Sequence, residues 1–261
     1  MHTHEITTRD AWLEARKALL AEEKALTRAR DAVNAKRLAL PWVQVEKSYT
    51  FEGADGPVTL AELFGERSQL IVYHFMLAPS ADGICVGCAF LCDHVDGARQ
   101  HLEQHDVSLI VVARAPFAEI EAVRRRMGWQ FRWVSSHQSD FNYDFNVSYT
   151  PEQMAGAPAN YNFAAIAPPI EDLSGVSVFY RDAEGGIFHT YSQYGRGGEE
   201  VIGAYAWLDI APLGRNETGP RHNLTDWVRL NDSYGVSGHI RETGQFIPAA
   251  PASSCPACAA E

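Results

Sequence analysis

The sequence lacks the long apolar runs of a membrane protein and is poor in basic residues. No stretch approaches the roughly 18 apolar residues of a membrane span, and the opening Met-His-Thr-His-Glu-Ile contains no apolar signal region. The chain has 22 Lys and Arg against 33 Asp and Glu, for a formal net charge of −11. Nucleic acids and anionic membranes bind concentrated positive charge. We therefore expect a cytoplasmic protein that binds neither nucleic acid nor membrane.

Three familiar binding motifs are also missing. The chain has no P-loop, no Gly-x-Gly-x-x-Gly dinucleotide fingerprint and no His-Glu-x-x-His metalloprotease motif. Nothing in the sequence therefore favours a nucleotide or a metalloprotease metal, and we expect no cofactor. The composition is that of an ordinary globular protein, because 46% of the 261 residues are hydrophobic. This length suits one large domain, or a medium domain with extensions.

Cysteine is scarce but unevenly distributed. Four of the five cysteines form two Cys-x-x-Cys pairs, Cys85 with Cys88 and Cys255 with Cys258. Five cysteines in a chain of this length do not resemble the disulfide scaffold of a small secreted protein. In a reducing compartment such pairs are more often catalytic or metal-binding.

The first pair follows a strand signal. Leu70–Leu77 is an apolar, β-branched and aromatic run typical of a buried central strand, and a loop of small residues separates it from Cys85. If a helix begins at the cysteines, its unpaired amides and dipole stabilise a thiolate on Cys85. Cys88, one turn later, then lies close enough to resolve a mixed disulfide. Redox chemistry is the favoured interpretation, with a zinc site or two structural thiols as alternatives.

The N-terminal residues 1–40 are predicted to form an amphipathic helix. Thr7 or Thr8 can cap it and Pro41 ends it. Apolar residues recur every seven positions, at Trp12, Leu19, Leu26 and Val33. This narrow stripe fits packing on the chain's own domain and, equally, a homodimer contact.

Strands and helices alternate over residues 41–232. We predict strands at residues 42–51, 69–77, 107–113, 130–135, 176–181 and 187–191, and helices at 85–105, 116–127 and 196–207. Such alternation is typical of right-handed βαβ units in an α/β protein. Residues 233–261 are predicted to be a flexible tail, because Pro, Ala and Ser dominate from Gln245 onward.

The order of elements around the cysteines resembles that of the thioredoxin superfamily. Within it, the sequence resembles a bacterial family known as domain of unknown function 899, described as predicted dithiol–disulfide oxidoreductases related to the peroxiredoxins. The matching segments are Leu40–Val43, Gln69–Met76, Cys85–Cys88, Met127–Trp129, Ser139–Phe145, Val178–Asp182 and Phe188–Gly197. The resemblance implies a thioredoxin-like fold, with a central mixed sheet flanked by helices, and an oxidoreductase activity.

Thiol chemistry assigns roles to the first cysteine pair. If the pair is redox-active, Cys85 is the exposed nucleophile with a lowered pKa and Cys88 the more buried resolving thiol. Thioredoxins place a cis-proline before the strand beside the active cysteines, whereas this chain has Ser174 or Gly175 there. A second departure is the C-terminal extension that carries Cys255 and Cys258.

Several residues are candidate accessories to this pair. Cys92 lies on the same predicted helix, as a buried thiol or as a third thiol that traps Cys88. Tyr73 and His74 lie near the carboxyl end of the central strand, where sites of α/β sheets gather. His74 could bind a metal, could adjust the reactivity of Cys85, or could simply be a packed, hydrogen-bonded histidine.

The second pair leaves three interpretations open. Cys255 and Cys258 relay electrons to the first pair, close a zinc site with Cys85 and Cys88, or are incidental. Our leading prediction for the protein is a thiol–disulfide oxidoreductase, or a thiol peroxidase-like enzyme. It would use a disulfide or peroxide substrate and a thiol reductant. The alternative is a thioredoxin-fold protein that binds zinc or copper, or a scaffold without turnover.

Overall fold

The computed structural model describes residues 4–249, so the second cysteine pair, Cys255 and Cys258, lies outside the described residues. The chain divides into two compact units between Trp42 and Val43. No helix among the described residues has the length and apolar character that crossing a membrane requires.

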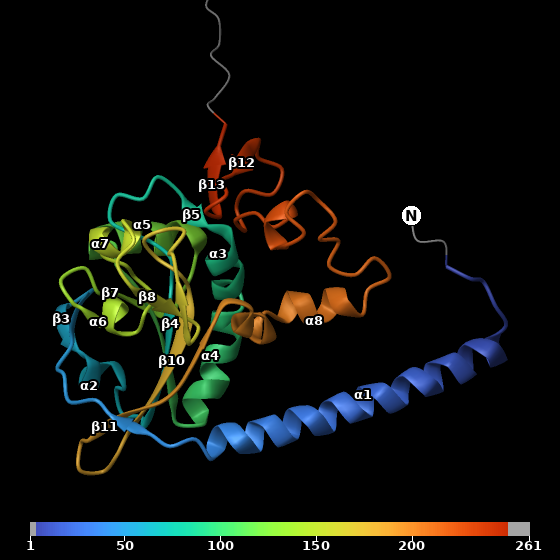
Figure 1. Cartoon of the computed structure of the whole chain (residues 1–261), viewed down its shortest axis with the longest axis horizontal. Helices are drawn as coiled ribbons and strands as arrows, with labels where there is room; N and C mark the ends of the chain where they lie inside the picture. The colour runs from blue at the N-terminus through green and yellow to red at the C-terminus, as the bar shows by residue number, and fades with distance from the viewer. Residues whose placement is uncertain (1–3, 250–261) are drawn as a thin grey trace, which may run out of the picture. The chain divides into compact units, whose positions relative to one another are not determined.

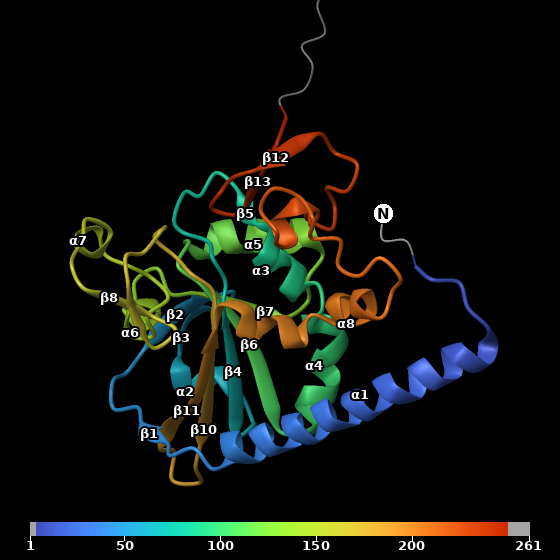
Figure 2. The same cartoon turned by 45° about the vertical axis from the view of Figure 1, so that its right-hand side comes forward.

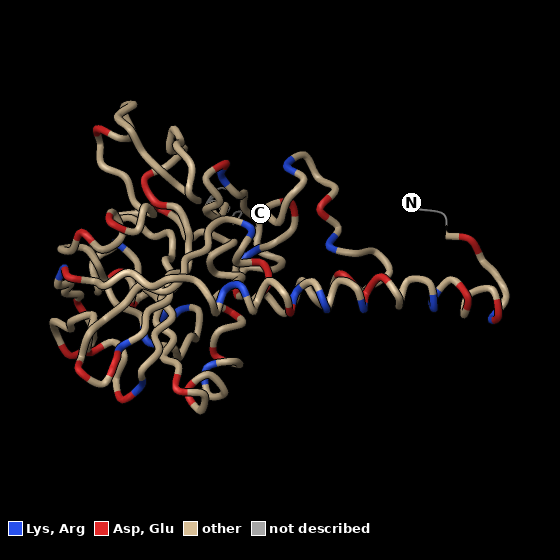
Figure 3. The backbone as a smooth tube through the Cα atoms, turned by 60° about the horizontal axis from the view of Figure 1, so that its bottom comes forward, with Lys and Arg blue, Asp and Glu red and all other residues tan. Residues whose placement is uncertain are grey.

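The first unit contains the predicted long helix, α1 (Arg9–Leu38). The hydroxyl of Thr8 accepts a hydrogen bond from the backbone N–H of Ala11 at 3.3 Å, so Thr8 is the N-cap. Asp10 in the first turn and Lys36 and Arg37 in the last turn complement the helix dipole. Acidic and basic residues mix along the whole helix (Figure 3). The homodimer contact, one of the two interpretations of this helix, stays a prediction.

The second unit is built on a mixed sheet of eight strands among the described residues (Figure 1). In spatial order they are β1 (Val43–Gln44), β11 (Ile187–Tyr194), β10 (Gly175–Arg181), β4 (Gln69–His74), β6 (Val107–Ala113), β7 (Arg132–Ser135), β2 (Thr50–Gly53) and β3 (Gly56–Thr59). The neighbours β4, β6 and β7 are parallel, and β10 pairs antiparallel with β4. This arrangement confirms the predicted α/β class and its thioredoxin-like topology.

Helices cover both faces of this sheet (Figure 2). The face of β4 that carries Tyr73 and Phe75 packs against α3 (Val86–Cys92), α4 (Val95–Gln104), α5 (Phe117–Met127) and α8 (Gly203–Asp209). The other face packs against α2 (Leu60–Leu63) and α6 (Phe141–Asp144). Because β6 is buried on both sides, its sequence is a continuous apolar run rather than an alternating one.

Several predicted elements differ from those observed. The helix expected over 85–105 breaks at Asp93–His94, where Asp93 accepts a hydrogen bond from the indole N–H of Trp129 at 2.8 Å. The strand expected over 42–51 is two short strands, β1 and β2. The helix expected to follow Arg196–Gly198 begins only at Gly203, because Gly195–Val201 forms a 3-10 segment, η1. The remaining short elements are α7 (Pro151–Met154), η2 (Leu224–Asp226) and the pair β8 (Ala159–Tyr161) and β9 (Ala164–Ile166).

The prediction of a flexible tail from residue 233 is wrong for part of that segment. Two strands, β12 (Gly238–Ile240) and β13 (Gln245–Pro248), form a hairpin, hereafter the C-terminal hairpin. Its second strand pairs with β5 (Ile84–Cys85), which makes a separate three-stranded sheet. Apolar residues explain the order, because Ile240 and Phe246 are buried in the core that contains the cysteines.

His74 lies on the face of β4 opposite to the cysteines. Its ring stacks on Phe141, with centroids 5.5 Å apart, and its Nε2 lies 2.9 Å from the hydroxyl of Ser177. Successive residues of a strand point to opposite faces, so Tyr73 faces the cysteines and His74 does not. Burial in this aromatic layer lowers the pKa of His74 to about 3, which keeps the ring neutral.

This burial predicts a pH dependence of stability. The unfolded chain binds a proton at His74 below about pH 6.5, whereas the folded chain does not until about pH 3. The free energy of unfolding is therefore unaffected by His74 well above about pH 6.5, and it decreases as the pH falls below that value because only the unfolded chain gains the proton. We expect His74→Gln to reduce the slope of unfolding free energy against pH, between pH 5 and 6.5, by roughly 1 kcal/mol per pH unit.

Urea unfolding at a series of pH values measures this slope. The control is His101→Gln, which removes a histidine from an exposed position of α4. Equal slopes for wild type and His74→Gln would show that the folded protein accepts a proton at His74 as readily as the unfolded chain.

Candidate functional site

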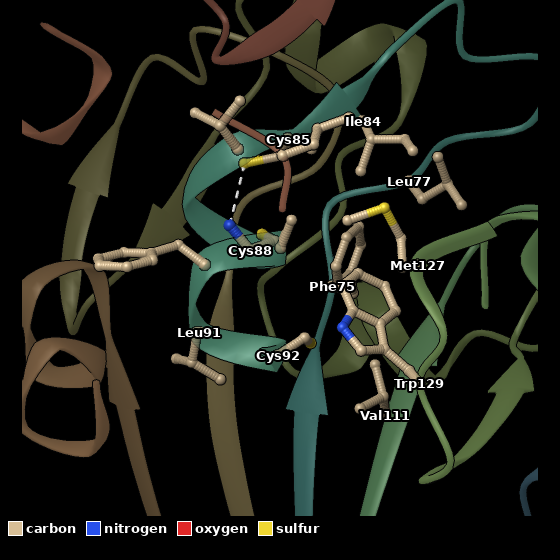
Figure 4. Close-up of a cluster of buried hydrophobic side chains, with 14 of the residues drawn as sticks. Phe75, Leu77, Ile84, Cys85, Cys88, Leu91, Cys92, Val111, Met127 and Trp129 are labelled. Atoms are coloured by element: carbon tan, nitrogen blue, oxygen red, sulfur yellow. Dashed lines mark hydrogen bonds between the residues drawn. The ribbon is translucent and has the colours of Figure 1, made fainter. Parts of the chain in front are cut away.

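The cysteine pair lies where β5 turns into α3. Cys85 is the N-cap residue of α3. Its sulfur accepts a hydrogen bond from the backbone N–H of Cys88 at 3.4 Å (Figure 4). This is the geometry by which an N-cap side chain satisfies an unpaired amide of the first helical turn. The structure therefore places Cys85 at the helix start that the sequence predicts.

The surroundings of Cys85 favour its thiolate. Hydrogen bonding by the Cys88 thiol lowers the pKa of Cys85, with further help from the backbone N–H groups of Cys88 and Gly87. Burial acts in the opposite direction, because it penalises the charged form. The net direction for Cys85 is downward, which increases the fraction of the nucleophilic form at neutral pH.

Cys88 lies deeper and titrates in the opposite direction. Burial raises its pKa well above the ordinary value, and the neighbouring Cys85 raises it further. The backbone N–H of Met76 donates to its sulfur at 3.5 Å. Tyr73 also hydrogen bonds to Cys88. Burial raises the pKa of the Tyr73 phenol well above its usual value, so the hydroxyl keeps its proton and acts as the donor.

The C-terminal hairpin covers the cysteine loop, a feature that our sequence reasoning missed. Gln245 of β13 pairs with Cys85, and the backbone N–H of Val86 donates to the carbonyl of Gly244 at 3.0 Å. An ion pair of 2.8 Å joins Arg241 to Asp82 in the loop before β5. Cys85 is consequently only 6% exposed, so the prediction that it is an exposed thiol is wrong.

Two glycines are the sequence features that could have indicated this contact between the hairpin and the cysteine loop. A Cβ on Gly83 would approach the Cβ of Gln245 to 2.7 Å, so only glycine lets the two segments meet. Gly244 has a φ of +90°, which favours glycine at the turn of the hairpin. These two glycines mark a close backbone approach, but neither one identifies its partner in the sequence.

A pocket of about 450 Å³ opens above the pair. Cys85 and Cys88 contribute to its wall together with Tyr73, Ser174 and Gly175. Further parts of the lining come from η1, from residues 222–225, and from Glu242, Thr243 and Gly244 of the C-terminal hairpin. Three carboxylates line it, those of Glu199, Glu217 and Glu242, against one guanidinium, that of Arg196. Its size is within the usual range of small-molecule sites.

Ser174 and Gly175 border this pocket where β10 begins. There is no cis peptide bond within residues 4–249. A Cβ on Gly175 would lie 2.8 Å from the ring of Tyr194 and 3.1 Å from Val147, so glycine is required there. The carbonyl of Ser174 accepts a hydrogen bond from the hydroxyl of Tyr161 at 2.7 Å.

Cys92 is separated from this pocket. It is fully buried near Val111 and Trp129 at the far end of α3 (Figure 4). Burial raises the pKa of its thiol well above the usual value, so it carries no thiolate at neutral pH. This is the environment of a structural thiol rather than of a third redox cysteine.

The described residues alone contain no metal site. Within residues 4–249, no group of three or more His, Cys, Asp and Glu side chains could hold a metal ion. A zinc site would therefore need ligands from residues 250–261. His74 lies on the opposite face of β4 from the cysteines, so it could not bind the same metal ion as Cys85 and Cys88.

Comparison with known proteins gives a family and a set of distant structural likenesses. The chain is similar to a cysteine-to-serine mutant of PrxQ from Xylella fastidiosa, at 12% identity and a TM-score of 0.39, covering 61% of this chain and 88% of that one. It is also similar to peroxidoxin BcpB from Mycobacterium tuberculosis, at 12% identity and a TM-score of 0.39, covering 63% of this chain and 94% of that one. A third similar structure is the mitochondrial 2-Cys peroxiredoxin from Plasmodium falciparum, at 12% identity and a TM-score of 0.38, covering 64% of this chain and 92% of that one. These likenesses are too distant to support any statement about the site.

The search of curated proteins finds no significant match. The family model described as "Bacterial protein of unknown function (DUF899)" matches residues 1–234, which is most of the chain. This match includes the Cys85–Cys88 pair but not Cys255 and Cys258. It confirms the resemblance found in the sequence, and the protein belongs to the DUF899 family of bacterial proteins.

Proposed function

We propose that the protein is a thiol–disulfide oxidoreductase in which Cys85 is the nucleophile and Cys88 the resolving thiol. The observation that carries this proposal is the asymmetry of the pair at the pocket wall. The pKa of Cys85 is lowered by its hydrogen bonds at the start of α3, whereas that of Cys88 is raised by burial. A low-pKa thiol beside a protonated one is what the two steps of disulfide exchange require.

The reaction begins with attack of the Cys85 thiolate on one sulfur of a disulfide substrate that enters the pocket. The second substrate sulfur leaves as a thiolate and takes a proton, and a mixed disulfide with Cys85 remains. Cys88 then loses its proton and attacks Cys85, which releases the first substrate half as a thiol. The substrate disulfide is thereby reduced to two thiols, and Cys85 and Cys88 become a disulfide. An external thiol reductant restores the pair.

Tyr73 supports the second step. Its phenol keeps its proton and hydrogen bonds to Cys88, and the Met76 N–H donates to the same sulfur. Both donors stabilise the thiolate that Cys88 must become when it attacks. Tyr73 is therefore a positioning residue for the resolving thiol.

The pocket favours a disulfide over a peroxide. A thiolate leaves readily on its own, because its conjugate acid has a pKa near 8.5. Cleavage of a peroxide expels a much more basic oxygen anion, which needs a nearby cation or acid. The guanidinium of Arg196 lines the pocket, but it is 86% exposed and held by Glu199 at 2.9 Å. Peroxide reduction is the secondary activity in this account.

Substitution of each cysteine tests this assignment. We expect Cys85→Ser to abolish reduction of a small disulfide, such as hydroxyethyl disulfide, and to leave the circular dichroism spectrum unchanged. Cys88→Ser is expected to react once and then accumulate the mixed disulfide on Cys85, visible as an added mass on that peptide. Steady-state assays coupled to glutathione and mass spectrometry measure both outcomes.

The matched control is Cys92→Ala, which removes a thiol from the same helix. Because Cys92 is buried away from the pocket, its loss should leave the rate of disulfide reduction unchanged. Full activity of Cys85→Ser would overturn the proposal. Stable mixed disulfide on Cys88 rather than on Cys85 would reverse the two roles.

The pH dependence of alkylation tests the role of the Cys88 thiol as a donor. Iodoacetamide reacts with thiolates, so the rate at Cys85 should rise with pH and level off above the pKa of Cys85. We expect the midpoint in wild type to lie below about 8.5, the ordinary value for cysteine. Cys88→Ala removes the donor and should move the midpoint upward, whereas Cys88→Ser keeps a donor and should move it less.

Fragment mass spectra assign the alkylated cysteine in each variant. Identical midpoints in all three proteins would show that the Cys88 side chain does not stabilise the Cys85 thiolate.

A further inference from the structure

We propose that the C-terminal hairpin is a size filter, which restricts the Cys85–Cys88 site to small disulfides and excludes disulfides within proteins. This inference rests on the proposed function, because it names the class of disulfide that the Cys85 thiolate attacks. The hairpin lies beyond the DUF899 match, which ends at residue 234. The filter is therefore a feature of this chain and not of the matched family region.

The turn of the hairpin lies against the reacting sulfur. A Cβ on Gly244 would be 3.7 Å from the sulfur of Cys85, which is van der Waals contact, so the turn covers one side of that atom. The carbonyl of Gly244 accepts a hydrogen bond from the backbone N–H of Val86 at 3.0 Å. With the hairpin in place Cys85 is only 6% exposed. A substrate sulfur therefore reaches Cys85 through the pocket that this residue lines.

Several contacts hold the hairpin in this position. The ion pair of 2.8 Å joins Arg241 to Asp82 in the cysteine loop. The guanidinium of Arg221 donates to the carbonyls of Ile240 and Arg241 at 2.6 and 3.0 Å. The side chains of Ile240 and Phe246 are buried in the core that contains the cysteines. The hairpin is consequently a fixed wall of the pocket rather than a loose cover.

The backbone beside the cysteines offers no free strand edge to a polypeptide. Extended peptides commonly bind by adding a strand to an open edge. One edge of β5 is taken by β13, and both residues of β5 are buried, so its other edge lies inside the protein. At the start of β10, Gly175 pairs with His74 on one side and Tyr194 on the other. The carbonyl of Ser174 is taken by the hydroxyl of Tyr161 at 2.7 Å.

The size of the pocket suits a small substrate. Its volume of about 450 Å³ lies toward the low end of the range of small-molecule sites. A small disulfide carries one short group on each sulfur. A protein disulfide carries two chain segments leading away from each of its cysteines, and the hairpin turn occupies space that these segments would need. The pocket therefore accepts the first class and excludes the second.

The reaction is the exchange of the proposed function with a small disulfide as substrate. A bond forms between Cys85 and one substrate sulfur, the substrate disulfide breaks, and the other half leaves as a thiolate and takes a proton. Attack by Cys88 on Cys85 then releases the first half. The substrate gains two electrons, and the cysteine pair becomes a disulfide that an external thiol reduces.

Substrates of different size test the filter in the full-length protein. Rates of reduction are measured for hydroxyethyl disulfide and for insulin, with dithiothreitol as the final reductant. Each kcat/KM is divided by the rate constant for dithiothreitol alone, which removes the intrinsic reactivity of the disulfide. In wild type we expect the normalised value for hydroxyethyl disulfide to exceed that for insulin at least about tenfold.

Gly83→Ala is the variant that loosens the hairpin. The new Cβ would approach the Cβ of Gln245 to 2.7 Å, so the two segments must move apart. We expect normalised kcat/KM for insulin to rise about tenfold, and that for hydroxyethyl disulfide to change less than about twofold. Arg221→Ala, which removes two hydrogen bonds to the hairpin, should act in the same direction. The matched control is Gly97→Ala, because a Cβ there meets nothing within 4 Å.

Alkylation of Cys85 measures access without turnover. The rate with iodoacetamide is compared with the rate with a polymer-linked maleimide, and mass spectrometry confirms the modified cysteine. The ratio of small to bulky reagent should be large in wild type and should fall in Gly83→Ala. Hydrogen exchange at the amide of Val86, which donates to the hairpin, reports whether a variant has loosened it.

Two results would overturn the filter. One is wild type that reduces insulin as efficiently as hydroxyethyl disulfide after normalisation. The other is a variant in which Val86 exchanges faster while both the substrate ratio and the alkylation ratio stay at their wild-type values. Failure of the proposed function looks different, because no variant would then reduce either disulfide, whereas the alkylation ratio would still follow the hairpin.

Discussion

The hydrogen bond from the Cys88 backbone N–H to the Cys85 sulfur is the interaction on which the rest of the site depends. It exists only because Cys85 ends β5 and caps α3, so that its side chain meets the open amides of the first turn. The same turn sends the Cys88 sulfur inward, toward Tyr73 and the Met76 amide. One local geometry therefore produces two thiols of opposite character.

Burial is the competing effect at this turn. Taking a thiolate out of water raises its pKa, and both cysteines lie almost entirely inside the protein. At Cys85 the donors of the first turn and the Cys88 thiol outweigh that cost. At Cys88 the donors, the Tyr73 hydroxyl and the Met76 N–H, do not outweigh it. The C-terminal hairpin contributes to the burial, since it pairs with β5 and walls the pocket. The hairpin therefore limits the access of solvent to Cys85.

Local patterns predicted much of this architecture. The apolar run of β6 and the cap of α1, predicted at Thr7 or Thr8, each depend on neighbouring residues alone, so the sequence indicated them. The Cys85–Cys88 position followed from the strand before it and the family resemblance. Contacts between distant segments were harder to predict. The pairing of β13 with β5 joins residues about 160 apart, and the composition of that segment resembles a flexible tail.

His74 illustrates the same point. Its position near the end of β4 left open a role at the cysteines or a packed, hydrogen-bonded histidine, and strand alternation sends its ring to the opposite face, where it is packed. Which face carries the site is settled by the helix that follows, not by the strand itself. Tyr73, one residue earlier, meets Cys88 for the same reason.

The reduction potential of the Cys85–Cys88 pair tests the central claim most directly. The full chain is equilibrated with mixtures of reduced and oxidised glutathione, free thiols are trapped, and the disulfide fraction at this pair is measured. Our account predicts a reversible transition at a potential of about −270 to −120 mV, the range of known dithiol oxidoreductases. Thiols that stay reduced and protected throughout would contradict the account. A disulfide that glutathione cannot reduce would contradict it as well.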